Sequence, residues 1–270
     1  MSALPPLNHR HHDARRLHSL LRDAAARRAE GAIVLEGPRI VGDALDRGIA
    51  FESVFLGPGA RRSFAPLVAR LEAVDVPVRD LKEGTLEKIG TTRTPQPVLG
   101  VVPRPSAGTI DGVPPGLIVV GLEIADPGNL GTIVRSAEAA GAVGVVVVGG
   151  VDPWNPKVVR GSAGSVFGLP IFEADDAEAV LGSLRGRGWR AVGADGSGAV
   201  VHTDADLTGP VALVLGSEAH GVPDAVAALL DTVVRIPMSG ASESLNVAVA
   251  ASVLMFEAAR QRRGESRSLS

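Results

Sequence analysis

The sequence predicts an α/β fold, with a mainly parallel sheet in a C-terminal domain and a smaller α/β domain before it. Short apolar stretches alternate with helical patterns along most of the 270 residues, as is typical of α/β proteins. In the second half these stretches are almost continuously apolar, as in LIVVGLEI, residues 117–124, and VALVLG, residues 211–216. Such strands are expected where helices cover both faces of a parallel sheet.

The first domain is predicted over residues 1–105, with residues 1–12 disordered and a small α/β sandwich after them. The spacing of its leucines predicts a helix over residues 13–29. The remaining expected elements, in order, are a strand at 31–37, a helix at 38–49, a strand at 51–58, a helix at 61–74, and strands at 76–81 and 97–103.

The second domain is predicted over residues 116–265. The stretch PRPSAGTIDGVPPG, residues 103–116, is rich in proline and glycine, so a linker is expected at residues 106–115. Six apolar segments are the expected strands of the second domain: 117–124, 143–150, 169–174, 189–195, 211–216 and 232–238.

Composition limits the kind of protein this is. The chain has no cysteine, which excludes disulfides, thiolate catalysis and zinc sites built on cysteine. No apolar run approaches the ~20 residues that a membrane span needs, and a cytoplasmic location is expected. The net charge is −3, but residues 1–105 carry +4 and the remainder −7. The basic first region could meet phosphate, or it could be an ordinary solvated helix surface.

Polar residues follow three of the predicted strands, where an open parallel sheet binds its ligands. In DPGNLGTIVRSAEAAG, residues 126–141, a turn at Pro127 and Gly128 leads to Asn129 and then to Arg135. These two side chains could line a site. Alternatively, Asn129 caps a helix and Arg135 is simply exposed.

The other two strands end in similar polar segments. In VALVLGSEAHGVP, Gly216 would let a ligand approach the backbone, and Glu218 would lie at the sheet edge or favour a helix dipole; His220 is expected to be a surface residue. In RIPMSGASESLNVAVAA, Ser244 and Asn246 precede a helix rich in alanine and valine. That segment could line a site or be an ordinary serine-capped core helix.

Together, NLGTIVRSA, LVLGSEAHGV and IPMSGASESLNVAVAA resemble the three signature motifs of the SpoU/TrmH family of RNA 2′-O-ribose methyltransferases, within the SPOUT superfamily. The segment NPKVVRGSAGSVFGLP is similar to the stretch between the first two motifs of that family. VLEGPRIVGDAL and TTRTPQPVLGVV resemble an L30e-like substrate-binding domain. The resemblance covers about residues 13–260.

The resemblance implies a deep trefoil knot and S-adenosyl-L-methionine bound within it, with no metal. The residues that match cofactor-lining positions of the family are Leu215, Gly216, Ile236, Met238 and Leu245. The residues that match its catalytic pocket are Asn129, Arg135, Glu218, Ser244 and Asn246. Proposals for the family make the arginine a base, but a guanidinium pKa above about 12 favours phosphate binding and stabilisation of alkoxide charge.

The expected partner is structured RNA, gripped by the first domain, with no DNA and no membrane. The expected RNA contacts are Arg15, Arg16, Arg39, Lys157 and Arg160. The L30e-like domain favours large-subunit 23S rRNA; the alternatives are transfer RNA and a non-catalytic rRNA assembly factor. A nicotinamide-dependent dehydrogenase is disfavoured because no glycine-rich fingerprint follows a strand. A homodimer is expected, with helix 247–260 as a contributor.

Overall fold

The computed structural model describes residues 5–91, 94–106, 108–217, 220–240 and 244–268. The chain divides into two compact units. Unit 1 contains residues 1–105 together with 154–167, and unit 2 contains residues 106–153 and 168–270. The segment 154–167 therefore belongs to unit 1, although both of its flanks in the sequence belong to unit 2.

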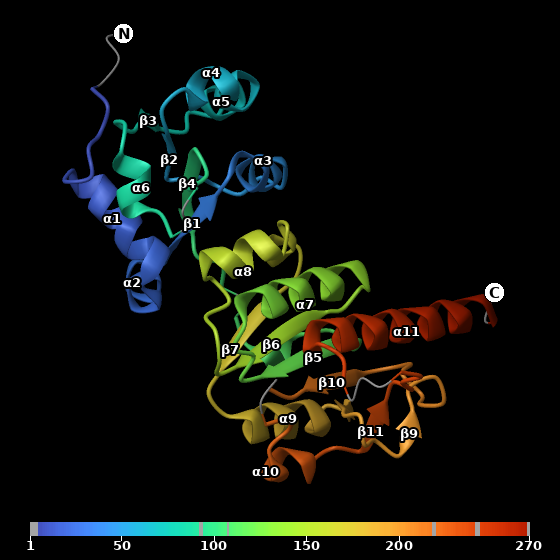
Figure 1. The fold of residues 1–270 in the computed structure, drawn as a ribbon. Helices are drawn as coiled ribbons and strands as arrows, with labels where there is room; N and C mark the ends of the chain where they lie inside the picture. The colour runs from blue at the N-terminus through green and yellow to red at the C-terminus, as the bar shows by residue number, and fades with distance from the viewer. Residues whose placement is uncertain (1–4, 92–93, 107, 218–219, 241–243, 269–270) are drawn as a thin grey trace. The chain divides into compact units, whose positions relative to one another are not determined.

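Unit 1 is built on a four-stranded sheet in the order β1-β4-β2-β3 (Figure 1). Its strands are β1 (Ala32–Glu36), β2 (Ser53–Leu56), β3 (Val78–Asp80) and β4 (Val98–Pro103). Its helices are α1 (His12–Arg22), α2 (Ala24–Glu30), α3 (Pro38–Asp46), α4 (Ala60–Ser63), α5 (Ala65–Ala73), α6 (Thr85–Ile89) and α8 (Pro156–Gly161). The strand β4 pairs antiparallel with β1 and β2, and β2 pairs parallel with β3.

The start of unit 1 differs from its prediction in two ways. Residues 5–12 are ordered rather than disordered, since buried Leu7 donates its N–H to Asp80 O and accepts from Lys82 N at its own carbonyl. The single helix expected over 13–29 is two helices, because Asp23 has an extended backbone and accepts a hydrogen bond from Ala25 N. A carboxylate in that position caps the start of α2 and ends α1.

Unit 2 contains a seven-stranded sheet in the order β7-β6-β5-β10-β8-β11-β9. Its strands are β5 (Leu117–Leu122), β6 (Gly144–Val148), β7 (Ile171–Ala174), β8 (Arg190–Ala194), β9 (Val200–Val201), β10 (Val211–Leu215) and β11 (Thr232–Arg235). Every pairing between them is parallel. The predicted α/β class with a large parallel sheet is confirmed; the trefoil knot stays a prediction.

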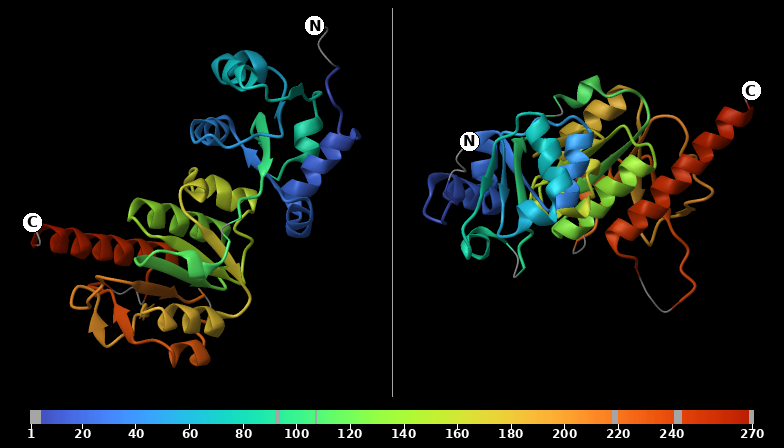
Figure 2. Two further views of the ribbon diagram at one scale, coloured as in Figure 1. Left: turned by 180° about the vertical axis from the view of Figure 1, so that it is seen from behind. Right: turned by 90° about the horizontal axis from the view of Figure 1, so that it is seen from above.

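Helices cover both faces of this sheet, as its apolar strands predict. Figures 1 and 2 show α7 (Pro127–Ala139) and α11 (Val247–Ser268) on one face, with α9 (Ala177–Gly186) and α10 (Asp224–Ala227) on the other. The strands β5, β6 and β10 are buried at every position. From β5 the chain first adds β6 and β7 on one side, and then crosses to β8 on the other side, where β10 is later inserted between β5 and β8. Ligands of such sheets bind beyond the carboxyl ends of the strands near the point where the strand order reverses.

Candidate active site

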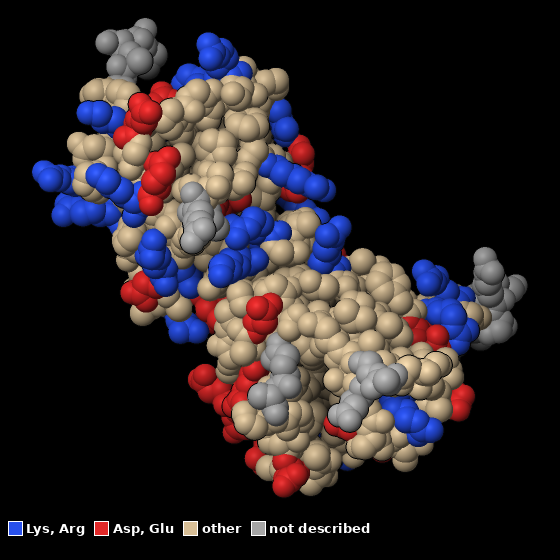
Figure 3. Space-filling view, viewed as in Figure 1, with Lys and Arg blue, Asp and Glu red and all other residues tan. Residues whose placement is uncertain are grey.

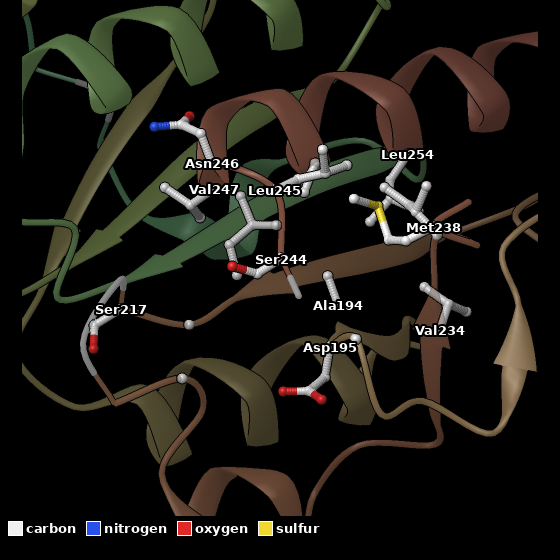
Figure 4. Close-up of a pocket in the computed structure, with 16 residues that line it drawn as sticks. Ala194, Asp195, Ser217, Val234, Met238, Ser244, Leu245, Asn246, Val247 and Leu254 are labelled. Atoms are coloured by element: carbon white, nitrogen blue, oxygen red, sulfur yellow. The ribbon is translucent and has the colours of Figure 1, made fainter. Parts of the chain in front are cut away.

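A pocket of about 500 Å³ lies at the carboxyl ends of β8, β10 and β11 and the start of α11 (Figure 4). It is lined by residues 194–196, 215–217, Gly221, Val234, Ile236, Met238, 244–247, Ala250 and Leu254. This lining includes all five residues that were predicted to contact the cofactor: Leu215, Gly216, Ile236, Met238 and Leu245. A concave pocket of this size, lined by both apolar and polar groups, is suited to a small organic molecule such as a nucleoside.

The sheet register brings these segments together. Ala194 at the end of β8 is level with Leu215 of β10 on one side and with Val234 of β11 on the other. Because all three strands are parallel, the loops that follow them leave the sheet at the same edge. The turn after β10 then folds back, with reciprocal backbone hydrogen bonds between Ser217 and Gly221.

The glycine at position 216 is explained by that turn. A Cβ atom there would lie 2.2 Å from the carbonyl carbon of Gly221, far inside contact distance. The close approach at Gly216 is therefore made by the backbone of the chain itself, and not by a ligand as predicted. Gly216 still lines the pocket, where it is partly buried.

A pair of asparagines joins α7 to α11 beside the pocket. Asn246 donates from Nδ2 to Oδ1 of Asn129 at 2.9 Å, and Asn246 Oδ1 accepts from the N–H groups of Ala248 and Val249. A second bridge between the helices joins Ser136 Oγ and Ser252 Oγ at 2.8 Å. The two bonded asparagines are 117 residues apart in the sequence and come from the first and third predicted motifs.

These bonds also correct the two capping alternatives. The α7 cap is Asp126, whose Oδ1 accepts from Asn129 N at 2.9 Å, so the Asn129 side chain is not the cap. The cap of α11 is Asn246 and not Ser244, which lines the pocket. Asn246 therefore combines two functions: its Oδ1 caps the start of α11, and its Nδ2 holds the side chain of Asn129.

Arg135 lies on the exposed side of α7, opposite the buried face formed by Leu130, Ile133 and Val134. Its guanidinium has no hydrogen bond or ion pair to any residue in the described ranges. The structure does not include it in the pocket lining, and Glu218 lies outside the described residues. An exposed guanidinium has five donors in a planar fork, an arrangement that suits phosphate oxygens.

Asp195 is a lining residue that the sequence analysis missed. It directly follows β8, and its Oδ1 accepts from Ser197 N at 2.8 Å and from Ser197 Oγ at 2.5 Å. The hydroxyl and backbone hydrogen bonds from Ser197 lower the pKa of Asp195 below its ordinary value. Its position at the end of the expected strand 189–195 could have identified it, since that strand ends at the same sheet edge as the other two.

The five residues expected to contact RNA all lie in unit 1, but they differ in their partners. Arg15, Arg39 and Lys157 are exposed, and their side chains make no ion pair within the part of the chain that the structure describes. Arg16 contacts Glu30 at 2.5 Å and Glu52 at 2.9 Å, and Arg160 contacts Glu36 at 2.7 Å. Figure 3 shows lysine and arginine side chains spread over unit 1 with carboxylates among them.

Two further features bear on cofactors and partners. Among the described residues, His11, His12 and Asp13 have side-chain atoms close enough to share a metal ion, and they lie near the start of α1, in unit 1 rather than in the pocket. No helix in the described part of the chain has the length and apolar character that crossing a membrane requires.

Comparison with known proteins identifies both parts of the chain. A family model described as the SpoU rRNA Methylase family matches residues 116–256, and one described as an MRM3-like substrate binding domain matches residues 15–100. A tRNA/rRNA methyltransferase of Mycobacterium avium (strain 104) is 34% identical over 272 residues, covering 96% of this chain and 88% of that protein.

One sequence and one crystal structure from Streptomyces viridochromogenes extend the comparison. The 23S rRNA (uridine(2479)-2′-O)-methyltransferase is 38% identical over 179 residues, which cover 62% of this chain and 61% of that protein. The crystal structure of the SpoU methyltransferase AviRb with AdoMet has a TM-score of 0.83 and 30% identity, covering 93% of this chain and 98% of that one. The chain belongs to the SpoU rRNA methylase family and is an RNA 2′-O-ribose methyltransferase that uses S-adenosylmethionine.

Proposed function

We propose that this enzyme methylates a ribose 2′-hydroxyl in 23S rRNA, with the pocket at the ends of β8, β10 and β11 as its cofactor site. The observation that carries the proposal is the position of this apolar pocket beside the Asn129–Asn246 pair. The 23S rRNA target is supported by the name of the Streptomyces viridochromogenes relative. Transfer RNA is the second candidate, because the Mycobacterium avium relative carries both substrates in its name.

The pocket residues fit a nucleoside cofactor. Leu215, Ile236 and Leu245 offer apolar walls for an adenine ring, and backbone groups at the strand ends can pair with its polar edge. When bound there, S-adenosylmethionine supplies a methyl group on a sulfonium, a strong electrophile. Met238 is 40% exposed, so its side chain would cover the mouth of the site.

The polar residues beside the pocket would position the attacking hydroxyl. A ribose 2′-hydroxyl must lose its proton as it attacks in line, and donors placed near the developing oxyanion lower that barrier. Arg135, whose guanidinium pairs with no described residue, can donate to the adjoining phosphate and to that oxygen. A guanidinium stays protonated in proteins and is therefore a poor base, so we assign Arg135 charge stabilisation. Asn129, Ser244 and Asn246 would fix the ribose, and Glu218 would orient Arg135.

The two parts of the chain would have different functions. We assign RNA binding to residues 1–105 and methyl transfer to residues 116–265, with residues 106–115 as the linker. The better phosphate contacts are Arg15, Arg39 and Lys157, which pair with no carboxylate of the described residues, whereas Arg16 and Arg160 already hold carboxylates. With no tyrosine in the chain, recognition would depend more on shape and charge than on base stacking.

A homodimer in the cytoplasm is part of this proposal. Three apolar residues of α11 are exposed at spacings of four and three residues: Val249 at 48%, Val253 at 37% and Phe256 at 46%. This spacing places them on one helix face, where a second copy of the chain could cover them. Light scattering should give twice the chain mass, and Val253→Asp should reduce it to one chain; a monomeric wild type at micromolar concentration would contradict the dimer.

The decisive experiment is methyl transfer from labelled S-adenosylmethionine to total bacterial RNA, followed by ribose-methylation mapping. Label in 23S rRNA at one nucleotide would establish the substrate. Label in the transfer RNA fraction would establish the second candidate instead. Cofactor binding without transfer to any purified RNA would exclude naked RNA and direct the same assay to ribosomal particles.

A further inference from the structure

The pocket contains one charged side chain among the lining residues that the structure describes. Asp195 is surrounded by apolar or small neighbours in the lining, whereas the other polar members, Ser217, Ser244 and Asn246, are neutral. Figure 4 shows Asp195 on the side of the pocket that lies across from Leu245 and α11. A single carboxylate in such a lining is a strong acceptor for a ligand that brings a hydrogen-bond donor.

The loop after β8 holds this carboxylate in a fixed orientation. Oδ1 accepts from both the N–H and the hydroxyl of Ser197, and Asp195 donates its own N–H to Val234 O at 3.0 Å. Within the described ranges, Oδ2 makes no hydrogen bond or ion pair. The bonds from Ser197 lower the pKa of Asp195, which keeps it ionised at neutral pH. One oxygen is therefore anchored while the other can accept.

The sheet places this oxygen centrally with respect to the apolar walls. The strand β8 lies between β10 and β11, which carry Leu215 on one side and lead to Ile236 and Met238 on the other. Asp195 is the first residue beyond the level of Ala194, which is in register with both neighbouring strands. A nucleoside whose base lies between those walls would therefore have its sugar within the reach of a residue on the middle strand.

We propose that Oδ2 of Asp195 accepts a hydrogen bond from a ribose hydroxyl of the cofactor. The inference rests on the proposed cofactor site. A carboxylate near the end of a parallel strand is a recurrent acceptor for ribose hydroxyls in nucleotide-binding proteins. Ser197 is the positioning residue, since it holds the other oxygen.

The cofactor carries three other groups that a carboxylate could bind: the sulfonium, the α-ammonium and the adenine amino group. Four ligands separate these from the ribose. S-adenosylmethionine carries all of the groups, and S-adenosylhomocysteine lacks only the sulfonium charge. Methylthioadenosine lacks both the sulfonium charge and the amino acid. Its 2′,3′-dideoxy form keeps the adenine and loses both ribose hydroxyls.

The test is calorimetric binding of these four ligands to the full chain and to Asp195→Ala. A matched control is Asp206→Ala, because Asp206 accepts from the N–H and hydroxyl of Thr208 in the same loop arrangement but does not line the pocket. Loss of a hydrogen bond to a charged acceptor should weaken binding by about tenfold or more. Asp195→Ala should show this loss for the three ribose ligands and none for the dideoxy form, whereas Asp206→Ala should match wild type.

Each other outcome overturns the inference in a distinguishable way. If only S-adenosylmethionine loses affinity, Asp195 binds the sulfonium. If S-adenosylmethionine and S-adenosylhomocysteine both lose affinity and methylthioadenosine does not, Asp195 binds the ammonium. An equal loss for the dideoxy ligand points to the adenine or to a collapsed pocket. The variant Asp195→Asn, which can keep the Ser197 bonds, separates those two. Wild type that binds the ligands, with Asp195→Ala unchanged, removes this inference alone; wild type that binds none of them removes the proposed site.

Discussion

Two arginines, Arg160 of unit 1 and Arg135 of unit 2, show two different uses of this residue. Arg160 of unit 1 holds Glu36, whose side chain is only 1% exposed. Arg135 of unit 2 has no ion pair within the described residues, although the helix around it is well packed. An arginine bound to a buried carboxylate stabilises the fold, while one with free donors is available to a ligand. The partners of an arginine, and not its presence in a motif, therefore indicate its function.

The largest effect should come from Arg135→Ala. Removal of a donor that stabilises developing charge typically lowers turnover by about a hundredfold to a thousandfold. Single-turnover methyl transfer to 23S rRNA should therefore fall by that factor, while the affinity for S-adenosylhomocysteine should stay at the wild-type value, because Arg135 does not line the pocket.

Arg135→Lys separates the charge from the geometry of the guanidinium. Lysine keeps the positive charge but loses the planar fork of donors, so it should recover only part of the rate. Arg185→Ala is the control in the same unit, since Arg185 is an exposed arginine paired with Asp231. If Arg135→Ala retained most of its turnover, Arg135 would have no role in methyl transfer.

Arg160→Ala should instead reduce the stability of unit 1. Glu36 is buried although Arg160 is 37% exposed, so removing the arginine leaves a buried carboxylate unpaired, which costs about 1 to 3 kcal/mol. Among the described residues Glu36 Oε1 has no hydrogen-bond partner, so the carboxylate depends on the one contact through Oε2. The chain has two tryptophans, Trp154 in unit 1 and Trp189 in unit 2. Urea unfolding followed by fluorescence in a Trp189→Phe background thus reports on unit 1.

The control for that measurement is Arg70→Ala. Arg70 pairs with Asp46 in the same unit, but both side chains are about half exposed or more. An exposed pair contributes less than about 1 kcal/mol, so the urea midpoint should move little. Equal shifts for Arg70→Ala and Arg160→Ala would show that the burial of Glu36 does not matter.

Much of unit 2 could be predicted from the sequence. Its strands are recognisable as apolar segments, and their apolar character at nearly every position predicts a parallel sheet covered by helices on both faces. The cofactor-lining residues came from motif resemblance, and all five lie in one pocket. Asp195 was missed because it lies outside the three motifs, although it ends an expected strand whose carboxyl end lies at the same sheet edge. The division of unit 1 was missed for a different reason: residues 154–167 join it through tertiary packing, which local sequence does not encode.

A smaller effect is expected from Asn246→Asp, which separates the two functions of that residue. Aspartate can still accept from Ala248 N and cap α11, but an ionised carboxylate cannot donate to Asn129 Oδ1. Stability should change little, whereas turnover should fall by about threefold to tenfold for a lost hydrogen bond worth about 1 kcal/mol. Asn246→Ala removes both functions and should also lower the melting temperature, because a lost cap costs about 1 kcal/mol. Equal melting temperatures for the two variants would contradict the capping role.

The smallest effect should distinguish the adjacent residues Arg15 and Arg16. Arg15 is exposed with no ion pair among the described residues, whereas Arg16 holds Glu30 and Glu52. Arg15→Ala should weaken RNA binding by a few-fold and lower the slope of log affinity against log salt by about one unit, as expected when one phosphate contact is lost. Arg16→Ala should leave that slope unchanged, because its charge is already matched within unit 1. Filter binding from low to moderate salt measures both slopes. A larger change for Arg16→Ala than for Arg15→Ala would mean that RNA displaces the intramolecular carboxylates, and that the partners seen in the free protein do not determine which arginines contact RNA.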